Sequence, residues 1–518
     1  MKVQRIKALF WIRKLSWGIL GLIILITLHF GLVLPLKAQQ VLTVGTEPAF
    51  PPFEMKAANG KTFEGFDIDL FRSIGEESGL KIEFQGMPFD GLIPALQSKN
   101  IDAAISGMTI TPERAQTVDF ARPYFQSGLA IAVRKDSQAG IKSFDDLENK
   151  KIAVAIGTTG AKQVKTIAGA EIFTFNDSAL ALKELSNGNV DAVVNDAPVT
   201  LYAIKVGNLD NLEVVGELLT EEYYGIALPK NSPNLEKINA ALDSLLQSGK
   251  YRQLYQKWFA GEPAKLPLVA PALEGDSAAF DWGKTFSNLL WGALVTLMLT
   301  AFSVLFGTIG GTLLATASIS GIKPLEWLCR IYIDFFRGTP LLVQIFMIYF
   351  GLPSLLQGLG LDFTFGRLPA AVTALSLNSA AYLAEIIRGG IQSIDNGQWE
   401  AAQSMGMGWT QTMRYVIFPQ AFRRMLPPLG NEFITMIKDT SLVAIIGFEE
   451  LFRQGQLMVA TTYRAFEIYA AVALIYLVLT FAASRLFSWL EKRLNPVRRA
   501  NKKAERQVKA SEQEQLVG

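Results

Sequence analysis

Long apolar runs with few charges fill the C-terminal half of the chain, between residues 285 and 490. A helix needs roughly 20 apolar residues to cross the hydrocarbon layer of a bilayer. Only helices and closed barrels satisfy their backbone hydrogen bonds there. The runs therefore predict an all-α transmembrane domain with five spans: Phe286–Ser318, Leu325–Leu356 (interrupted by the polar Arg337-Gly338-Thr339-Pro340), Leu368–Ile391, Pro427–Phe448 and Phe466–Leu490.

The length, the net charge and the residue types of the chain limit its domain organisation and its classes of site. At 518 residues the chain is too long for one ordinary domain, so we expect a multidomain protein. The net charge of +2 gives no indication of nucleic-acid binding, and we expect no nucleic-acid partner. A single cysteine, Cys329, and a single histidine, His29, exclude an internal disulfide and argue against a metal site or a Ser-His-Asp triad.

The N-terminal 40 residues have the pattern of an export signal. Basic residues from Lys2 to Lys14 precede an uncharged apolar run, Leu15–Leu36. This order predicts that the N-terminus stays in the cytoplasm and that residue 41 onward is exported. Residues 1–40 are either a signal peptide cleaved after Ala38 or a retained membrane anchor, and both alternatives stay open.

Basic residues also orient the predicted spans. Lys323, Arg330, Arg414 and the basic tail at residues 491–518 all fall on one side of the membrane if the first span runs inward. Basic loops are typically cytoplasmic. We therefore expect a multi-pass protein of the bacterial inner (plasma) membrane, in contact with lipid, with a cytoplasmic C-terminus and an external domain.

Residues 41–260 have the pattern of an α/β domain. Short β-branched runs alternate with helix-like segments such as Phe66–Ser78, Ser178–Ser186 and Pro233–Ser248, which predicts α/β layers with largely parallel sheets, in two lobes. A proline-containing linker, residues 261–284, follows. The expected strands are Val41–Gly45, Lys81–Phe84, Ile101–Ser106, Ala130–Arg134, Lys151–Ile156, Glu171–Phe175, Val190–Asn195 and Tyr224–Leu228.

Several polar residues of this domain stand at the ends of predicted elements. Thr111-Pro112-Glu113-Arg114 is a helix start that places Arg114 near a strand end, where ligands bind in open α/β sheets. Thr158 and Thr159 begin another helix, and Asp196 ends a strand. A guanidinium for a carboxylate, a carboxylate for an ammonium and nearby aromatic faces suit a free amino acid.

The order and spacing of these motifs resemble the polar amino acid periplasmic binding proteins, solute-binding family 3. The resemblance implies a bilobed α/β domain that closes on its ligand. It implies that Arg114 and Thr159 bind the α-carboxylate and Asp196 the α-ammonium. Gly107 and Thr109 would supply backbone and hydroxyl contacts, and Phe50 and Phe89 would flank the ligand side chain. Glu47 would read the distal end, which favours Gln, Arg, Lys or His over acidic ligands.

The segment GQWEAAQSMGM, followed by FPQAFRRMLPPLGNEFI, resembles the EAA loop of His/Gln/Arg-type ABC importer permeases. The resemblance extends over residues 285–490, and the EAA loop lies at 398–420. It implies that Glu400, Ala401 and Ala402 dock on an ATPase subunit. Gly406 permits a sharp turn between two short helices. Pro419 is expected to interrupt the second of them.

Four polar residues within or near the predicted spans need partners, because such groups are costly in lipid. They are Asn378, Glu385, Glu432 and Asp439. They either line a transient amino-acid site in the membrane domain or hold neighbouring helices together near their cytoplasmic ends. The sequence leaves both alternatives open.

The chain has no G-x-x-x-x-G-K-[ST] phosphate loop, so we expect it to bind no cofactor and to depend on a separate ABC ATPase dimer that uses ATP. A single EAA loop favours a homodimer of the chain over a pair with a different permease. The fused arrangement resembles cyanobacterial glutamine and basic amino acid transporters and implies an importer subunit rather than an enzyme. A ligand-gated channel or a sensor is the alternative, although neither a TVGYG-type filter nor a signalling domain is present.

Overall fold

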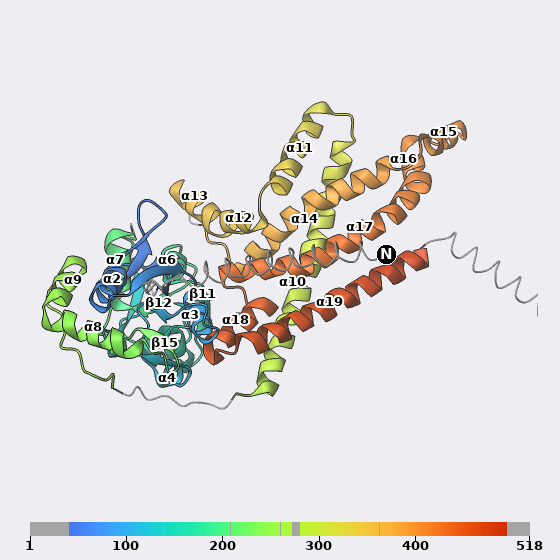
Figure 1. Cartoon of the computed structure of the whole chain (residues 1–518). Helices are drawn as coiled ribbons and strands as arrows, with labels where there is room; N and C mark the ends of the chain where they lie inside the picture. Colours follow the sequence, from blue (N-terminus) through green and yellow to red (C-terminus); the bar gives the residue numbers. More distant parts are fainter. Residues whose placement is uncertain are drawn as a thin grey trace, which may run out of the picture.

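The computed structural model describes residues 41–137, 139–207, 209–259, 261–271, 280–361 and 363–494. It shows an α/β domain followed by a helical domain (Figure 1). The predicted signal peptide or anchor at residues 1–40 and the tail beyond residue 494 lie outside the described residues.

The first lobe of the α/β domain is built on a five-stranded sheet in the order β5-β1-β6-β15-β7. β1, β5 and β6 are parallel, and β15 is antiparallel to both of its neighbours. A small sheet, β2-β3-β4, adjoins it. The bounds are β1 Val41–Thr46, β2 Ala49–Phe50, β3 Glu54–Lys56, β4 Phe63–Glu64, α2 Phe66–Ser78, β5 Lys81–Gly86, α3 Phe89–Gln97, β6 Ala103–Ala104, α4 Pro112–Thr117, β7 Val118–Phe120, β15 Ala227–Pro229, α8 Leu235–Gln247 and α9 Lys250–Trp258.

The second lobe repeats this plan, with the strand order β11-β10-β12-β9-β13. β10, β11 and β12 are parallel, whereas β9 is antiparallel to both of its neighbours, β12 and β13. The bounds are β9 Leu129–Arg134, β10 Lys151–Ala155, α5 Thr159–Gln163, β11 Glu171–Phe175, α6 Ser178–Ser186, β12 Ala192–Asp196, α7 Ala197–Val206 and β13 Leu212–Val215, with 3-10 turns at Asp145–Leu147 and Val164–Thr166.

A two-stranded ribbon joins the lobes: β8 (Phe125–Ser127) pairs with β14 (Glu222–Tyr224) in antiparallel fashion. The predicted bilobed α/β domain is confirmed, but the prediction of largely parallel sheets is only partly right. β9 and β15 each follow a ribbon strand, so they enter their sheets from the edge where the parallel strands end and run in the opposite direction.

The helical domain contains three helices long and apolar enough to cross a membrane: α10 (Trp282–Ser318), α14 (Arg367–Gln392) and α19 (Ala465–Leu494). A fourth candidate is a pair bent by 107°, α11 (Lys323–Gly338) and the segment from Leu341. That segment comprises α12 Leu341–Phe346, a π-helical turn at Met347–Gly351 and α13 Leu352–Gly358. The bend falls at the predicted polar interruption.

Small residues let α10 and α14 approach closely. A Cβ added at Gly307 would lie 2.9 Å from Cβ of Ser379, and one added at Gly311 would lie 2.8 Å from Cβ of Leu383. Glycine at these positions therefore lets the two helices pack backbone against backbone, as is common between membrane helices.

The fourth predicted span begins earlier than expected. Helix α17 runs from Phe418 to Asp439 and includes Pro427 and Pro428, where the sequence had predicted its start. Packing along α14 and α19 holds this helix in place despite the backbone hydrogen bonds that the two prolines remove. A 3-10 segment, Thr440–Ile446, completes the predicted span, and an unpredicted helix, α18 (Leu451–Thr462), follows.

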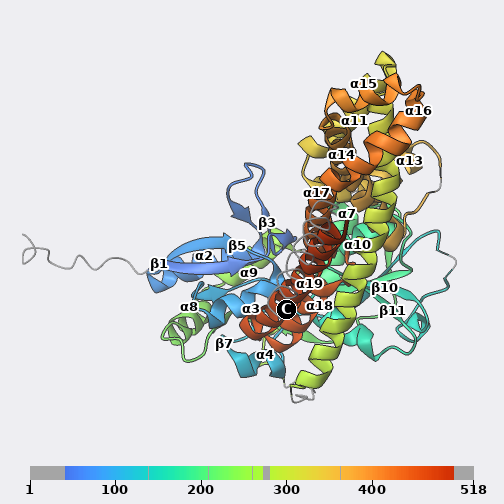
Figure 2. The same ribbon diagram turned by 90° about the vertical axis from the view of Figure 1, so that its right-hand side faces the viewer.

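The EAA segment forms α15 (Asn396–Ser404), α16 (Trp409–Thr412) and a π-helical turn at Met413–Ile417. Figures 1 and 2 show α15 and α16 at the end of the helical domain far from the α/β domain. Helix α18 lies at the other end, beside α3 of the first lobe.

Candidate functional site

A small cavity lies between the two lobes. It brings together every residue that the sequence assigned to the substrate site. The lining residues are Glu47, Phe50, Phe89, Gly107, Thr109, Arg114, Thr158, Thr159, Ser178 and Asp196.

Arg114 links the lobes across this cavity. Thr111 caps α4, accepting a hydrogen bond from the Arg114 N–H, and so fixes the buried Arg114 in the first turn. The guanidinium donates to the carbonyl of Thr109 in the first lobe (2.6 Å) and to the carbonyl of Gly157 in the second (2.9 Å). A guanidinium carries five N–H donors, so donors remain for a carboxylate ligand. Its Cζ also lies 5.2 Å from the ring centre of Phe89.

Glu222, which the sequence analysis missed, organises the threonines of the site. This buried carboxylate in the hinge ribbon accepts hydrogen bonds from the hydroxyls of Thr109 (2.6 Å) and Thr159 (2.9 Å). An acidic pair such as Glu221-Glu222 is ordinarily expected to face solvent. The sequence therefore carried no signal that Glu222 is buried beside the site.

Asp196, at the end of β12, supplies a second carboxylate. The hydroxyl of Tyr224 donates a short hydrogen bond to it. Burial, with the nearby Glu222 carboxylate, raises the pKa of Asp196 to about 7. An ammonium group placed here would compensate both carboxylates.

Glu47 is buried at the end of the first strand, and its backbone N–H donates to the Ser106 hydroxyl (3.0 Å). Burial raises the pKa of the Glu47 carboxyl well above its usual value, and the charges of Asp177 and Asp90 add to this effect. This carboxyl therefore favours either a proton or a cationic ligand group.

Gly107 lies in the wall of the cavity. Its N–H donates to the carboxylate of Asp67 (2.9 Å) and so is already engaged. Its φ is +51°, and an added Cβ would lie 2.5 Å from the ring of Phe50. Gly107 therefore leaves room for the Phe50 ring at the cavity wall, and the predicted backbone contact to a ligand cannot come from its N–H.

The EAA segment presents only part of its predicted docking residues outward. Glu400 and Ala401 are exposed, but Ala402 is 4% exposed and packs against its own chain. Gly406 has a φ of +78° and makes the turn between α15 and α16. The predicted interruption near Pro419 takes the form of a π-helical turn rather than a break. The chain passes from α16 through the π turn at Met413–Ile417 into α17, and Pro419 lies in the first turn of α17.

The four polar residues of the membrane domain do not share one environment. The Asn378 amide donates to Oε1 of Gln344 (2.9 Å), whose own amide donates to the carbonyls of Phe336 (2.8 Å) and Thr339 (3.0 Å). Asn378 and Gln344 thus hold the bend between α11 and α12.

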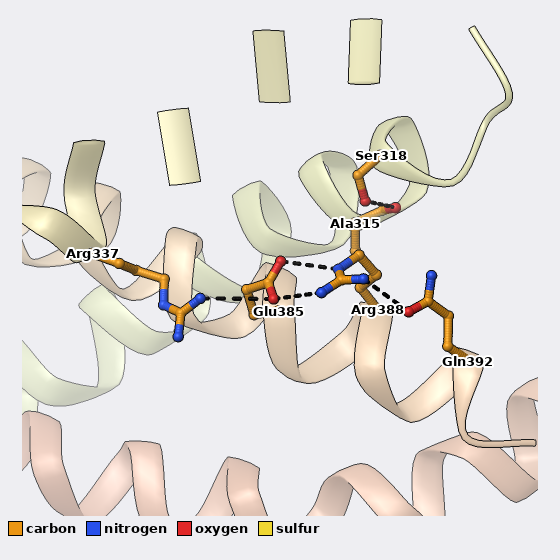
Figure 3. A network of polar contacts seen from close by, with 6 residues as sticks. All are labelled: Ala315, Ser318, Arg337, Glu385, Arg388 and Gln392. Carbon is orange, nitrogen blue, oxygen red and sulfur yellow. Dashed lines mark hydrogen bonds and ion pairs between the residues drawn. The ribbon is translucent and has the colours of Figure 1, made fainter. Parts of the chain in front are cut away.

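Figure 3 shows Glu385 between two guanidinium groups. Arg388 donates to both carboxylate oxygens, at 3.0 and 2.7 Å, and Arg337 of α11 forms an ion pair at 3.7 Å. These contacts support the alternative in which Glu385 holds helices together. Glu432 lies elsewhere, on α17, and accepts a hydrogen bond from Ser379 (3.4 Å). Asp439 is the last residue of the same helix.

Comparison with known proteins accounts for both halves of the chain. Residues 42–261 match the bacterial extracellular solute-binding proteins, family 3, and residues 307–496 match the binding-protein-dependent transport system inner membrane component. The glutamine transport system permease protein GlnP of Escherichia coli K12 is 42% identical over 219 residues, which is 42% of this chain and 98% of that protein. The chain belongs to the binding-protein-dependent amino-acid ABC transporters.

Two further comparisons cover the two halves of this ABC transporter chain separately. The octopine transport system permease protein OccM of Rhizobium radiobacter is 43% identical over 43% of the chain and 92% of that protein. An ancestral arginine-binding protein solved with arginine is 47% identical over 42% of the chain and 98% of that protein, with a TM-score of 0.41. The ABC transporter chain thus fuses a solute-binding domain to an inner-membrane permease domain.

Proposed function

We propose that this chain captures glutamine or a basic amino acid in its external domain and passes it through its permease domain, in an importer driven by a separate ATPase. The observation that carries the proposal is the cavity between the lobes, where Arg114 lies with the carboxylates Glu47 and Asp196. Arg114 and Thr159 would bind the α-carboxylate, and Asp196 with Glu222 would bind the α-ammonium.

Glu47 supports the choice of ligand class. A deprotonated Glu47 would pair with the side chain of arginine, lysine or histidine. A protonated Glu47 would donate a hydrogen bond to the side-chain amide of glutamine instead. An acidic ligand would bring a further carboxylate to the Glu47 end of the cavity, which is unfavourable in a buried site.

Calorimetric titration of the full chain in nanodiscs with each of the twenty amino acids tests this function. We expect arginine, lysine, histidine or glutamine to bind most tightly. With Glu47→Gln, binding of the basic ligands should weaken more than binding of glutamine, because only the basic ligands lose an ion pair. Tightest binding of glutamate or aspartate would refute the assignment.

The end of the permease domain opposite the external domain suits an ATPase partner (Figure 1). Next to the exposed Glu400 and Ala401, Met405 is 79% exposed and Trp409 is 58% exposed. Exposed apolar side chains gathered on one surface typically mark a protein interface. The ATPase would bind here on the cytoplasmic side, and the C-terminus would be cytoplasmic.

The polar helix α17 would complete five membrane crossings, because it runs along α14 and α19. One EAA segment per chain favours a homodimer, which would present two such segments and two external domains. Native mass spectrometry of the detergent-solubilised complex should find two copies of this chain with two ATPase subunits. A different permease subunit in the complex would refute the homodimer.

Asn378 and Glu432 remain candidates for a transient amino-acid site within the permease domain. Each forms a hydrogen bond with a residue of a neighbouring helix. Transport by Asn378→Ala in vesicles should fall while binding to the external domain stays intact. Unchanged transport would remove Asn378 from the proposed site.

A further inference from the structure

Two carboxyl groups lie together in the interior of the first lobe, behind the wall of the cavity. Glu54 on β3 and Asp67 in the first turn of α2 are each fully buried. The Asp67 N–H donates to the carbonyl of Phe53 (2.9 Å), which brings the start of α2 against the residue before Glu54. Neither group lines the cavity, and neither has a lysine or arginine partner among the described residues.

The side chains of Glu54 and Asp67 hydrogen-bond to each other. Two ionised carboxylates only accept hydrogen bonds, so this contact requires a proton on one of them. Oε2 of Glu54 and Oδ1 of Asp67 are buried and have no N–H or O–H partner elsewhere in the described part of the chain. These are the oxygens left for a proton between the two groups.

The surroundings decide which group carries the proton. Oδ2 of Asp67 accepts from the N–H of Gly107 (2.9 Å) and from the hydroxyl of Tyr124 (2.6 Å). Asp67 also lies at the positive N-terminal end of α2. Glu54 accepts from the Ser106 hydroxyl (2.6 Å) alone among the described donors. Donors favour the ionised form of a carboxyl group, so Asp67 is the carboxylate and Glu54 is the acid.

Burial raises the pKa of both groups. The pKa of Asp67 rises to about 6, and that of Glu54 rises well above its usual value because the charges of Asp67 and Glu47 add to burial. The other titratable groups that act on this pair are Tyr124 and Tyr251, and burial raises the pKa of both hydroxyls, so they stay neutral. At neutral pH the pair therefore holds one proton.

Three residues of the cavity wall are fixed by this pair. Ser106, which donates to Glu54, accepts a hydrogen bond from the N–H of Glu47 (3.0 Å). Phe50 lies directly opposite Glu54 in the β2–β3 ladder. Gly107 is held by the other carboxyl group. The shape of this wall therefore depends on contact between the two carboxyl groups.

We propose that Glu54 and Asp67 are positioning residues of the amino-acid site, which share one proton and thereby hold the cavity wall in its ligand-binding form. The inference rests on the proposed function in taking the cavity as an amino-acid site. Loss of the proton leaves two buried negative charges in contact, and their repulsion releases Ser106 and Gly107. Because the folded state raises the pKa of Glu54, the stability that its proton contributes is present at low pH and is lost as pH rises through the folded-state pKa.

Titration calorimetry of the full chain in nanodiscs with L-arginine and L-glutamine tests this role. The affinity of the unaltered chain should fall at alkaline pH, above about pH 8, by at most about tenfold per pH unit for one lost proton. In Glu54→Gln, the amide can donate to Asp67 and accept from Ser106 but cannot ionise. Its affinity at neutral pH should stay within about threefold of the unaltered chain, and its alkaline loss should be smaller.

Glu54→Ala removes both contacts and should weaken binding by roughly tenfold or more at every pH. Glu64→Gln, at an exposed position on the same small sheet, is the matched control and should keep the pH profile of the unaltered chain. Asp196, Glu47 and the amino group of the ligand titrate in all of these proteins, so differences between them report on Glu54. An alkaline loss in Glu54→Gln as steep as in the unaltered chain would overturn the proposal.

Infrared spectroscopy without ligand tests the proton itself, because a protonated carboxyl group absorbs apart from a carboxylate. At neutral pH, Glu54→Gln should lose one protonated-carboxyl band that the unaltered chain and Glu64→Gln both show. Loss of no such band would overturn the shared proton, whatever the affinity. A chain that shows the band but binds no amino acid would overturn the proposed function instead.

Discussion

At the scale of single residues, the site depends on buried carboxylates whose charge is set by their surroundings. Asp196, Glu222 and Glu47 are all buried, and Arg114 is the cationic member of the cavity. Removal from water favours the neutral form of a carboxyl group. Ligand binding and proton binding therefore compete at this site, and both can be measured.

Asp196 should make amino-acid binding depend on pH. The pKa of Asp196 in the folded protein, about 7, exceeds the ordinary aspartate value of 3.8. The stability that this raised pKa contributes is therefore present below about pH 4 and is lost as pH rises through 7. An ammonium ligand needs the ionised form. We expect affinity to rise between pH 5 and 8, by at most about tenfold per unit for one released proton.

Asp196→Asn should lower the affinity at pH 8 by about 30-fold or more, because it removes one of the two carboxylates that would pair with the buried ammonium. It should also remove the pH-dependent component assigned to Asp196. Asp67, whose pKa burial raises to about 6, titrates in the same range, so titration calorimetry must compare the variant with the unaltered chain. Asp210→Asn, at an exposed position, is the control. Equal pH profiles in all three proteins would contradict the assignment.

Gly107→Ala should destabilise the external domain more than a glycine substitution ordinarily does. A left-handed φ costs a non-glycine residue roughly 1–2 kcal/mol. The added Cβ would also meet the Phe50 ring at 2.5 Å. Gly60 has a φ of +67° with nothing within 4 Å of an added Cβ, so Gly60→Ala isolates the backbone cost. Thermal unfolding should show the larger loss for Gly107→Ala, and equal losses would contradict the steric argument.

At the scale of elements, the EAA segment has one exposed alanine and one buried alanine side by side. Ala401→Arg should prevent association with the ATPase while leaving the chain folded, because the side chain would project into the proposed interface. Ala402→Arg should instead disrupt the packing of α15 on its own chain. Co-purification with the cognate ATPase and thermal unfolding together separate the two effects. Normal ATPase binding by Ala401→Arg would contradict the proposed interface.

At the scale of the whole molecule, the linker should keep the external domain at the permease. Leu268 is 73% exposed and Val269 is 80% exposed, so a protease site inserted between them should be accessible. Tethering supplies an effective concentration of about mM. If the chain lacks a retained N-terminal anchor, cleavage should lower transport in proteoliposomes and make it depend on added external domain. For such a chain, the same insertion without protease is the control, and unchanged transport after cleavage would contradict the need for tethering.

Patterns local in the sequence determined the class of this protein. The apolar runs predicted the long helices, and the alternation of strand-like and helix-like segments predicted the bilobed domain. Both patterns can be read from neighbouring residues, because the period of burial and the length of a span are properties of a continuous segment. The eight residues assigned to the substrate site, from their place at element ends and from the family resemblance, also line one cavity in the tertiary structure.

Only the tertiary structure decided the rest, because it depends on contacts between distant segments. Packing on two neighbouring helices carries α17 through Pro427 and Pro428. Folding buries Glu222 among hydroxyl donors that lie 63 and 113 residues away. Arg453 reaches groups 277 and 279 residues earlier in the chain. A pattern of neighbouring residues cannot predict which distant partner binds a buried charge. The continuity of α17 and the burial of Glu222 and Arg453 were therefore not predicted from the sequence.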